Sequence, residues 1–204
     1  MRDHIGTERT LGTKLIAAGE ARTAVLRRTY PASIDDLWAA ITDPARLRSW
    51  FTAPRGELRR GGTYALEGSG HGRILRCDSP RMLRVSWSSG PGHPDEVEVR
   101  LSKADAGGAV LELEHATVAT TAPDGVSDAI LGVGVGWELA MAWLDRHIRG
   151  EGEPRSPGRS GEKALQPTAE DQALLAESTR AWTDLVDGSE GVTATPHAGD
   201  RPAR

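Results

Sequence analysis

Residues 95–118 read DEVEVRLSKADAGGAVLELEHATV, and this stretch decides the fold. Apolar and charged residues alternate in both of its halves, which is typical of a strand with one face in a core and the other in water. Gly107 and Gly108 between the halves supply the turn of a hairpin. The apolar positions are Val97, Val99, Leu101, Leu111 and Leu113, and the acids opposite them, Glu96, Glu98, Glu112 and Glu114, are expected to be solvated on the outer face.

Working back toward the N-terminus, four more short segments are separated by Gly, Ser and Pro turns, which extends the hairpin into an antiparallel meander. Within residues 72–78, the neighbours Ile74 and Leu75 both favour burial, so the sequence does not decide which residues of that strand face the core. Ahead of the meander, residues 21–30 are rich in strand-forming residues and end at Pro31, so they predict a first strand. The four further segments are 55–60, 62–67, 72–78 and 81–88.

Two short helices are predicted between the first strand and the meander. Ser33 can cap the first one, with Asp36 three residues later. Asp43 can cap the second, with Pro44 at the first helical position, where its missing N–H is not needed. The apolar stripe of the first helix is Ile34, Leu37, Trp38 and Ile41, and the anchors of the second are Leu47, Trp50 and Phe51.

A long helix is predicted from about Ser127 or Asp128 to Arg149. It is apolar on nearly two faces, so we expect contacts on both sides. Its Gly132, Gly134 and Gly136 lack the spacing of a dinucleotide-binding loop and follow no βαβ strand, so close approach of another element is the better interpretation. One stripe holds Ile130, Val133, Trp137, Ala140, Met141, Leu144 and Ile148, and the other holds Leu131, Val135, Leu139 and Trp143.

The chain therefore divides into one main domain and two flanking parts. Residues 1–20 are an N-terminal extension and residues 21–149 are the domain. Residues 150–167 have the composition of a flexible linker, and residues 168–188 predict a tail helix capped by Thr168 and Asp171, which either folds back onto the second stripe of the long helix or binds a partner. Residues 189–204 are predicted to be disordered.

The distribution of charged and apolar residues argues against some classes of function. Residues 150–204 carry ten acids and six bases, whereas residues 1–149 hold 19 of each sign, so no basic excess favours nucleic-acid binding. No stretch reaches the roughly 18 apolar residues of a membrane span.

The single cysteine, Cys77, excludes an internal disulfide and fits a cytoplasmic protein. We expect it to be a small buried hydrophobe. Six of the nine aromatic residues are Trp, and Trp50, Trp87 and Trp137 can either fill an interior or line a cavity.

Catalytic and metal-binding motifs are absent from the sequence. The six histidines show no ligand spacing, and no serine lies in a G-x-S-x-G elbow. His115 continues the alternation of Leu111 and Leu113 onto the dry face; a hydrogen-bonded structural histidine is favoured there over a catalytic or ligand-orienting one. We therefore expect no catalytic residues, no metal and no cofactor.

Several pieces of the sequence together resemble one family, over roughly residues 21–149. The chain is similar to the START-like, birch-pollen-allergen-like superfamily (SRPBCC), in the branch related to the activator of the heat-shock protein 90 ATPase. The pieces are Pro31-Ala32, Leu37-Trp38-Ala39-Ala40, Thr42-Asp43-Pro44, Leu47, Trp50-Phe51, Gly61-Gly62-Thr63-Tyr64, Gly72-Arg73-Ile74, Pro80, Leu83, Trp87, Leu111-Glu112-Leu113-Glu114-His115 and Gly136-Trp137.

The resemblance implies an α+β helix-grip fold, in which a curved antiparallel sheet of about seven strands, in the order β-α-α-β6-α, wraps a long C-terminal helix. It also implies a cavity for apolar ligands between them. We expect non-enzymatic binding of a small hydrophobic molecule, lipid-like or polyketide-like. The expected ligand-binding residues are Trp50, Tyr64, Leu66, Ile74, Trp87, Leu113, His115, Val133, Trp137 and Met141.

Two other function classes stay open. One is a chaperone-associated or other protein-interaction module, and the second is a polyketide cyclase-like enzyme. The enzyme needs an ionisable side chain inside the cavity, for which His115, Glu67, Arg73 and Arg84 are the candidates. No nucleic acid and no membrane insertion are expected, and a homodimer is left open.

Overall fold

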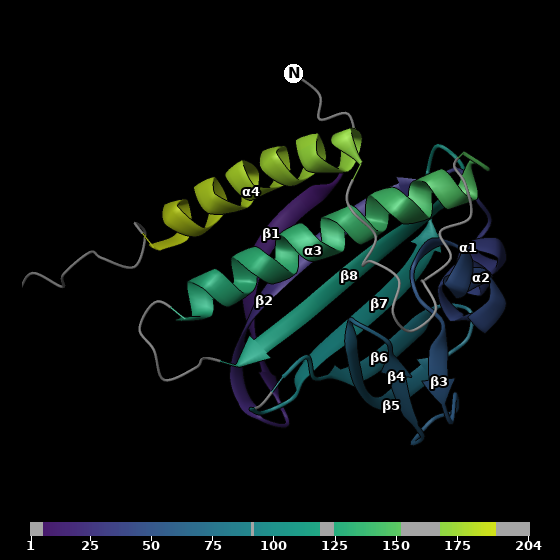
Figure 1. Cartoon of the computed structure of the whole chain (residues 1–204), viewed down its shortest axis with the longest axis horizontal. Coiled ribbons are helices and arrows are strands. Elements are labelled where there is room, and N and C mark those ends of the chain that lie inside the picture. The colour runs from purple at the N-terminus through teal and green to yellow at the C-terminus, as the bar shows by residue number, and fades with distance from the viewer. Residues whose placement is uncertain (1–5, 91, 119–124, 152–167, 191–204) are drawn as a thin grey trace, which may run out of the picture.

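A computed structural model describes residues 6–90, 92–118, 125–151 and 168–190, and one antiparallel sheet of eight strands forms its centre. Its strand order is β1-β2-β8-β7-β6-β5-β4-β3. The long helix α3 crosses one face of this sheet, called the inner face below, and α4 lies beside α3 (Figure 1). The strands are β1 (Glu8–Ile16), β2 (Gly19–Tyr30), β3 (Pro54–Gly56), β4 (Thr63–Leu66), β5 (Gly70–Asp78), β6 (Met82–Trp87), β7 (Asp95–Lys103) and β8 (Ala109–Val118). The helices are α1 (Ile34–Thr42), α2 (Pro44–Trp50), α3 (Gly125–Ile148) and α4 (Ala169–Glu190).

The α+β helix-grip fold is confirmed, with one strand more than predicted. From β2 to α3 the elements follow the expected order, but β1 comes from residues 1–20, which were predicted as an N-terminal extension without an assigned strand. It pairs with β2 from Glu8 opposite Arg27 to Ile16 opposite Gly19. More than half of its residues are polar and Leu15 is 82% exposed, so the sequence of β1 lacks the regular alternation of apolar and charged residues seen in β7 and β8.

The predicted helix caps are confirmed. The backbone N–H of Asp36 donates to Ser33 Oγ over 3.1 Å at the start of α1. Asp43 Oδ1 accepts from the N–H groups of Ala45 and Arg46 at the start of α2, and Pro44 occupies the first position. Because Asp43 ends one helix and begins the next, α1 and α2 turn sharply at one end of the sheet (Figure 1).

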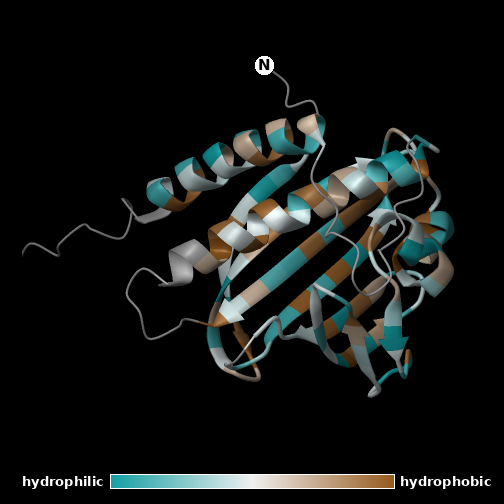
Figure 2. Cartoon of the chain, in the orientation of Figure 1, coloured by the Kyte–Doolittle hydropathy of each residue, from teal (hydrophilic) through white to brown (hydrophobic). Residues whose placement is uncertain are grey.

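Bands of alternating hydropathy run along the central strands (Figure 2), and the apolar residues of β7 and β8 join the same core as residues of α3. The core joins the inner face to α1, α2 and α3. It is built from fully or nearly fully buried residues, including Leu26, Tyr30, Leu37, Val97, Leu101, Leu111, Leu113, Ile130, Met141 and Leu144.

The outer face of the sheet is less exposed to solvent than predicted. Glu98 is only 5% exposed and Glu96 only 9%, so the expectation that these acids are solvated is wrong. Arg84 lies directly opposite Glu98 on β6, with its Nε 3.1 Å from Glu98 Oε2, and Arg100 pairs with the same carboxylate. The long arginine stems cover the carboxylates across the strands, which alternation alone does not predict.

The tail helix α4 packs against α3 and β1 (Figure 1). Close approach occurs at Gly134, where a Cβ atom would lie 2.4 Å from Trp182 Cε2, whereas Gly132 and Gly136 have no such neighbour. The glycine interpretation therefore holds at Gly134. The capping pair is confirmed as well, since Asp171 N–H donates to Thr168 Oγ1 and Thr168 N–H donates to Asp171 Oδ2.

A buried carboxylate fixes this contact. Glu138 on α3 has no exposed surface, and its Oε2 accepts hydrogen bonds from Arg9 Nε at 2.9 Å, Ser178 Oγ at 2.7 Å and Trp182 Nε1 at 3.1 Å. Arg9 Nη2 also pairs with Glu138 Oε1. One side chain thus links β1, α3 and α4.

The C-terminal boundaries can be compared with the predicted ones in part. Helix α4 continues to Glu190, two residues past the predicted end. Beyond Glu151, the linker predicted for 150–167 lies outside the described residues, as does the tail predicted for 189–204 beyond Glu190. Among the helices that the structure describes, none is both long and apolar enough to cross a membrane.

Candidate functional site

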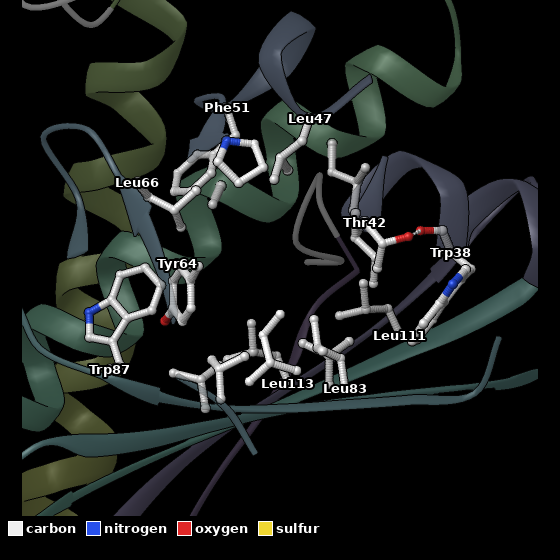
Figure 3. Close-up of a pocket in the computed structure, with 18 of the residues that line it drawn as sticks. Trp38, Thr42, Leu47, Phe51, Tyr64, Leu66, Leu83, Trp87, Leu111 and Leu113 are labelled. Atoms are coloured by element: carbon white, nitrogen blue, oxygen red, sulfur yellow. Dashed lines mark hydrogen bonds between the residues drawn. The ribbon is translucent and has the colours of Figure 1, made fainter. Parts of the chain in front are cut away.

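A cavity of about 270 Å³ lies between the inner face of the sheet, helices α1 and α2, and the middle of α3. Side chains from the sheet, α1 and α2 surround it (Figure 3). Helix α3 adds Trp137, Ala140, Met141 and Leu144 to its wall. Its wall consists of Trp38, Ile41, Thr42, Leu47, Trp50, Phe51, Pro54, Leu58, Tyr64, Leu66, Ile74, Cys77, Ser79, Leu83, Val85, Trp87, Val97, Val99, Leu111, Leu113, Trp137, Ala140, Met141 and Leu144.

A register shift in β5 settles the ambiguity between Ile74 and Leu75. Ile74 pairs with Val85 and Cys77 pairs with Leu83, with an irregularity between Ile74 and Arg76. The extra residue brings Ile74 and Cys77 to the same inner face, although they are three positions apart. Leu75 is left 39% exposed.

Several polar groups in the wall are already bonded to the protein. Tyr64 OH donates to the carbonyl of Ser86 at 2.9 Å, and burial raises the pKa of Tyr64 well above its usual range. Thr42 Oγ1 donates to the carbonyl of Trp38, and Trp50 Nε1 donates to the carbonyl of Ala40. The surface offered to a ligand is therefore mainly carbon, which favours an apolar guest.

A cluster of aromatic rings closes one end of the cavity. The rings of Trp87 and Trp137 are 5.3 Å apart in an edge-on arrangement, and Tyr64 lies beside Trp87. Trp87 packs over Gly70, where a Cβ atom would come within 2.7 Å of its ring. Trp50, Trp87 and Trp137 thus all line the cavity, which decides between the two interpretations of the tryptophans.

His115 holds Trp137 in place from behind. Its Nδ1 accepts from Trp137 Nε1 at 2.8 Å, and its Nε2 lies 3.0 Å from Asp95 Oδ2, which also accepts from Thr117 Oγ1. With one nitrogen accepting, the other carries the proton toward Asp95. His115 is 2% exposed and is therefore the hydrogen-bonded structural histidine that the sequence favoured.

Two of the ten predicted ligand-binding residues do not line the cavity. His115 is on the expected face, but the rings of Trp87 and Trp137 enclose it, so it does not reach the wall. Val133 lies one turn before Trp137, the residue at which the α3 part of the wall begins. The structure brings the other eight together around the cavity: Trp50, Tyr64, Leu66, Ile74, Trp87, Leu113, Trp137 and Met141.

Cys77 is exposed, so its predicted burial is wrong. It lies at the edge of the cavity because the irregular strand β5 turns it inward near the turn to β6. Partial burial of the thiol, and after it the Asp78 carboxylate, raise the pKa of Cys77. A thiol with a raised pKa carries little thiolate, which disfavours a nucleophilic role.

Many of the other wall residues were not predicted as part of the site. Those from α1 and α2 include Trp38, Ile41, Leu47 and Phe51, which had been predicted only as helix anchors. Their apolar stripes were a usable signal, since a stripe facing the open end of a sheet lines a cavity as readily as it fills a core.

None of the four candidate ionisable residues for an enzyme, His115, Glu67, Arg73 and Arg84, lines the cavity. Across the residues that the structure describes, no group of three His, Cys, Asp or Glu side chains is arranged to hold a metal ion. The cavity wall therefore offers Tyr64 and Cys77 as its titratable groups, both with raised pKa values.

A family model described as "Activator of Hsp90 ATPase homolog 1-like protein" matches residues 31–149. The crystal structure of CalU16 from Micromonospora echinospora is 41% identical, covers 88% of this chain and 98% of its own, and superposes with a TM-score of 0.73. The solution structure of CalU16 is similar, with 40% identity, coverage of 92% and 99%, and a TM-score of 0.72.

A more distant structure, the protein encoded by gene BPP1335 of Bordetella parapertussis, shares 23% identity over 84% of this chain and 88% of its own, with a TM-score of 0.56. At that identity the likeness concerns the fold. No curated protein matches the chain.

Proposed function

The chain belongs to the family of Activator of Hsp90 ATPase homolog 1-like proteins, in the SRPBCC superfamily, and on this basis we propose that it binds a small hydrophobic molecule without transforming it. One observation carries the proposal: a cavity of about 270 Å³ whose wall is mainly carbon, with the side-chain donors of Tyr64, Thr42 and Trp50 already bonded to backbone carbonyls. Acid–base catalysis needs a titratable group with a suitable pKa within reach of the substrate. The titratable side chains of the wall, Tyr64 and Cys77, both have raised pKa values, so neither titrates near neutral pH. A lipid-like or polyketide-like molecule fits this chemistry.

The expected affinity can be worked from the hydrophobic effect. Burying about 300 Å² of ligand surface at about 25 cal/mol/Å² contributes roughly 7 kcal/mol. Association costs about 4 kcal/mol or more, which leaves a dissociation constant on the millimolar scale for a purely apolar ligand. Tighter binding requires a larger ligand, a preorganised site or a polar contact.

The cavity can be tested by partly filling it. Tryptophan emission of the protein is measured during titration with 1-octanol, since several tryptophans line the wall. The variant Ala140→Leu adds three carbon atoms to the wall, roughly a third of the cavity at about 30 Å³ per group. The control Ala176→Leu makes the same change on the exposed surface of α4.

We expect a saturable change in emission for the wild type and the control, and weaker binding for Ala140→Leu. Native mass spectrometry of the purified protein then shows whether a ligand is carried through purification. No saturable response, or equal affinity in both variants, contradicts the proposal.

A second candidate function is interaction with a chaperone, which is favoured by the description of the matched family. It predicts that the full chain raises the ATPase rate of an Hsp90 protein and co-purifies with it. An unchanged rate at saturating concentrations of the chain excludes this role.

A further inference from the structure

Positive charge is concentrated in one segment of the chain. Residues 46–81 contain eight arginines and three acids, a net charge of +5, whereas the whole chain has a net charge of −4. The same segment supplies the exposed residues of the cavity wall, Leu58, Cys77 and Ser79, which therefore mark its mouth. The neutral total for residues 1–149 conceals this local excess. The eight arginines are Arg46, Arg48, Arg55, Arg59, Arg60, Arg73, Arg76 and Arg81.

The fold gathers several of these arginines around the mouth. Leu58 lies in the loop between β3 and β4, directly before Arg59 and Arg60. That loop packs beside β5, because the guanidinium of Arg73 donates to the Gly61 carbonyl at 2.8 Å. In the turn before β6, Arg81 follows the mouth residue Ser79 by two positions.

Only half of the positive charge is neutralised. Within the part of the chain that the structure describes, four of the arginines form ion pairs, and the other four are exposed without a carboxylate in ion-pair range. The paired set is Arg46 with Asp36, Arg55 with Glu67, Arg59 with Glu57 and Arg76 with Asp78. The unpaired set is Arg48, Arg60, Arg73 and Arg81.

We propose that the ligand of this cavity is an anionic amphiphile, with its apolar body inside and a carboxylate or phosphate group at the arginine-rich mouth. The inference rests on the proposed function and adds the chemical class of the ligand. A guanidinium group presents paired donors that match a carboxylate or a phosphate. The volume of about 270 Å³ admits roughly nine groups of about 30 Å³ each, so an eight-carbon chain is a suitable probe.

Three probes with the same tail separate charge from apolar contact: octanoate, 1-octanol and octyltrimethylammonium. We expect octanoate to bind roughly fivefold more tightly than 1-octanol, and the cation to bind most weakly, because exposed charge pairs contribute modest energies. Raising the salt concentration from about 0.01 M to about 1 M shortens the screening length from about 30 Å to about 3 Å, so the advantage of octanoate should disappear.

The double variant Arg60→Glu/Arg81→Glu should weaken octanoate binding and leave 1-octanol binding unchanged. Arg180→Glu on α4 is the matched control and should change neither. Equal binding of octanoate and 1-octanol, unaffected by the double variant, overturns the anionic-ligand inference and leaves the cavity function standing. Absence of binding by all three probes overturns both.

Discussion

Replacing Glu138 by Gln should destabilise the protein strongly. Glu138 is fully buried between β1, α3 and α4, and its carboxylate accepts from Arg9, Ser178 and Trp182. The amide oxygen of Gln can still accept from Ser178 and Trp182. The guanidinium of Arg9, whose side chain is 13% exposed, would then lose its ion pair with Glu138.

The expected magnitude follows from the loss of that ion pair. Breaking a buried ion pair by removing one partner lowers the free energy of unfolding by about 3–5 kcal/mol. For a chain of this size each kcal/mol shifts Tm by roughly 2–4 °C, so Glu138→Gln should lower Tm by about 6 °C or more. The double variant Arg9→Met/Glu138→Gln removes both charges, so its loss should be at least about 2 kcal/mol smaller than the sum of the single losses.

Urea unfolding followed by circular dichroism measures all three variants against a surface control, Glu8→Gln. Glu8 is also on β1 and pairs with Arg27 at 3.8 Å, but both side chains are more than half exposed. Its loss should stay within about 0.5 kcal/mol. If Glu138→Gln falls within about 1 kcal/mol of the wild type, or if the double variant is additive, the Glu138 network does not hold α4 in place.

Two further predictions concern helix α3. Gly134→Ala should destabilise the protein by about 1–3 kcal/mol, because the new Cβ would overlap the ring of Trp182. Gly136→Ala should instead stabilise it by roughly 0.5–1 kcal/mol through helix propensity. Thermal melts compare the two variants, and equal effects would refute the close contact between Gly134 and Trp182. Burial, together with the nearby Arg46, lowers the pKa of His147 from its ordinary 6.5. The unfolded chain then binds this proton more readily, so stability falls as the pH drops below about 6.5. His147→Gln should reduce that loss between about pH 7.5 and pH 5.5 in urea unfolding, and an unchanged slope would contradict the assignment.

Local signals in the sequence predicted a large part of the fold. Alternation in β7 and β8 determines which side chains face the core, and the caps at Ser33, Asp43 and Thr168 depend on neighbours two or three residues away. Such contacts are readable because both partners lie in one short segment. For the same reason, the faces of most wall residues were predictable.

Interactions between distant segments were not predictable. Strand β1 is stabilised in part by Arg9, whose partner Glu138 is 129 residues away, and nothing in the local pattern marks that pair. The burial of Glu98 likewise requires that Arg84 stand opposite it on the neighbouring strand.

The positions of His115 and Cys77 relative to the cavity differ from the predictions for a similar reason. Strand alternation placed His115 on the correct face, but the position of α3 along the sheet puts Trp137 over it. At Cys77 the β5 irregularity changes which face a residue occupies. Crossing positions and bulges depend on the whole assembly, so sequence periodicity does not determine them.

The central claim is that the cavity takes up a small apolar molecule. The most direct measurement is a methyl NMR titration of the protein with 1-octanol, which compares cavity methyl groups with those of α4. We predict saturable shifts for Leu83, Leu113 and Met141, which line the cavity, and unchanged signals for Leu175 on α4. Unchanged cavity methyls, or shifts of equal size at Leu175, would contradict the claim.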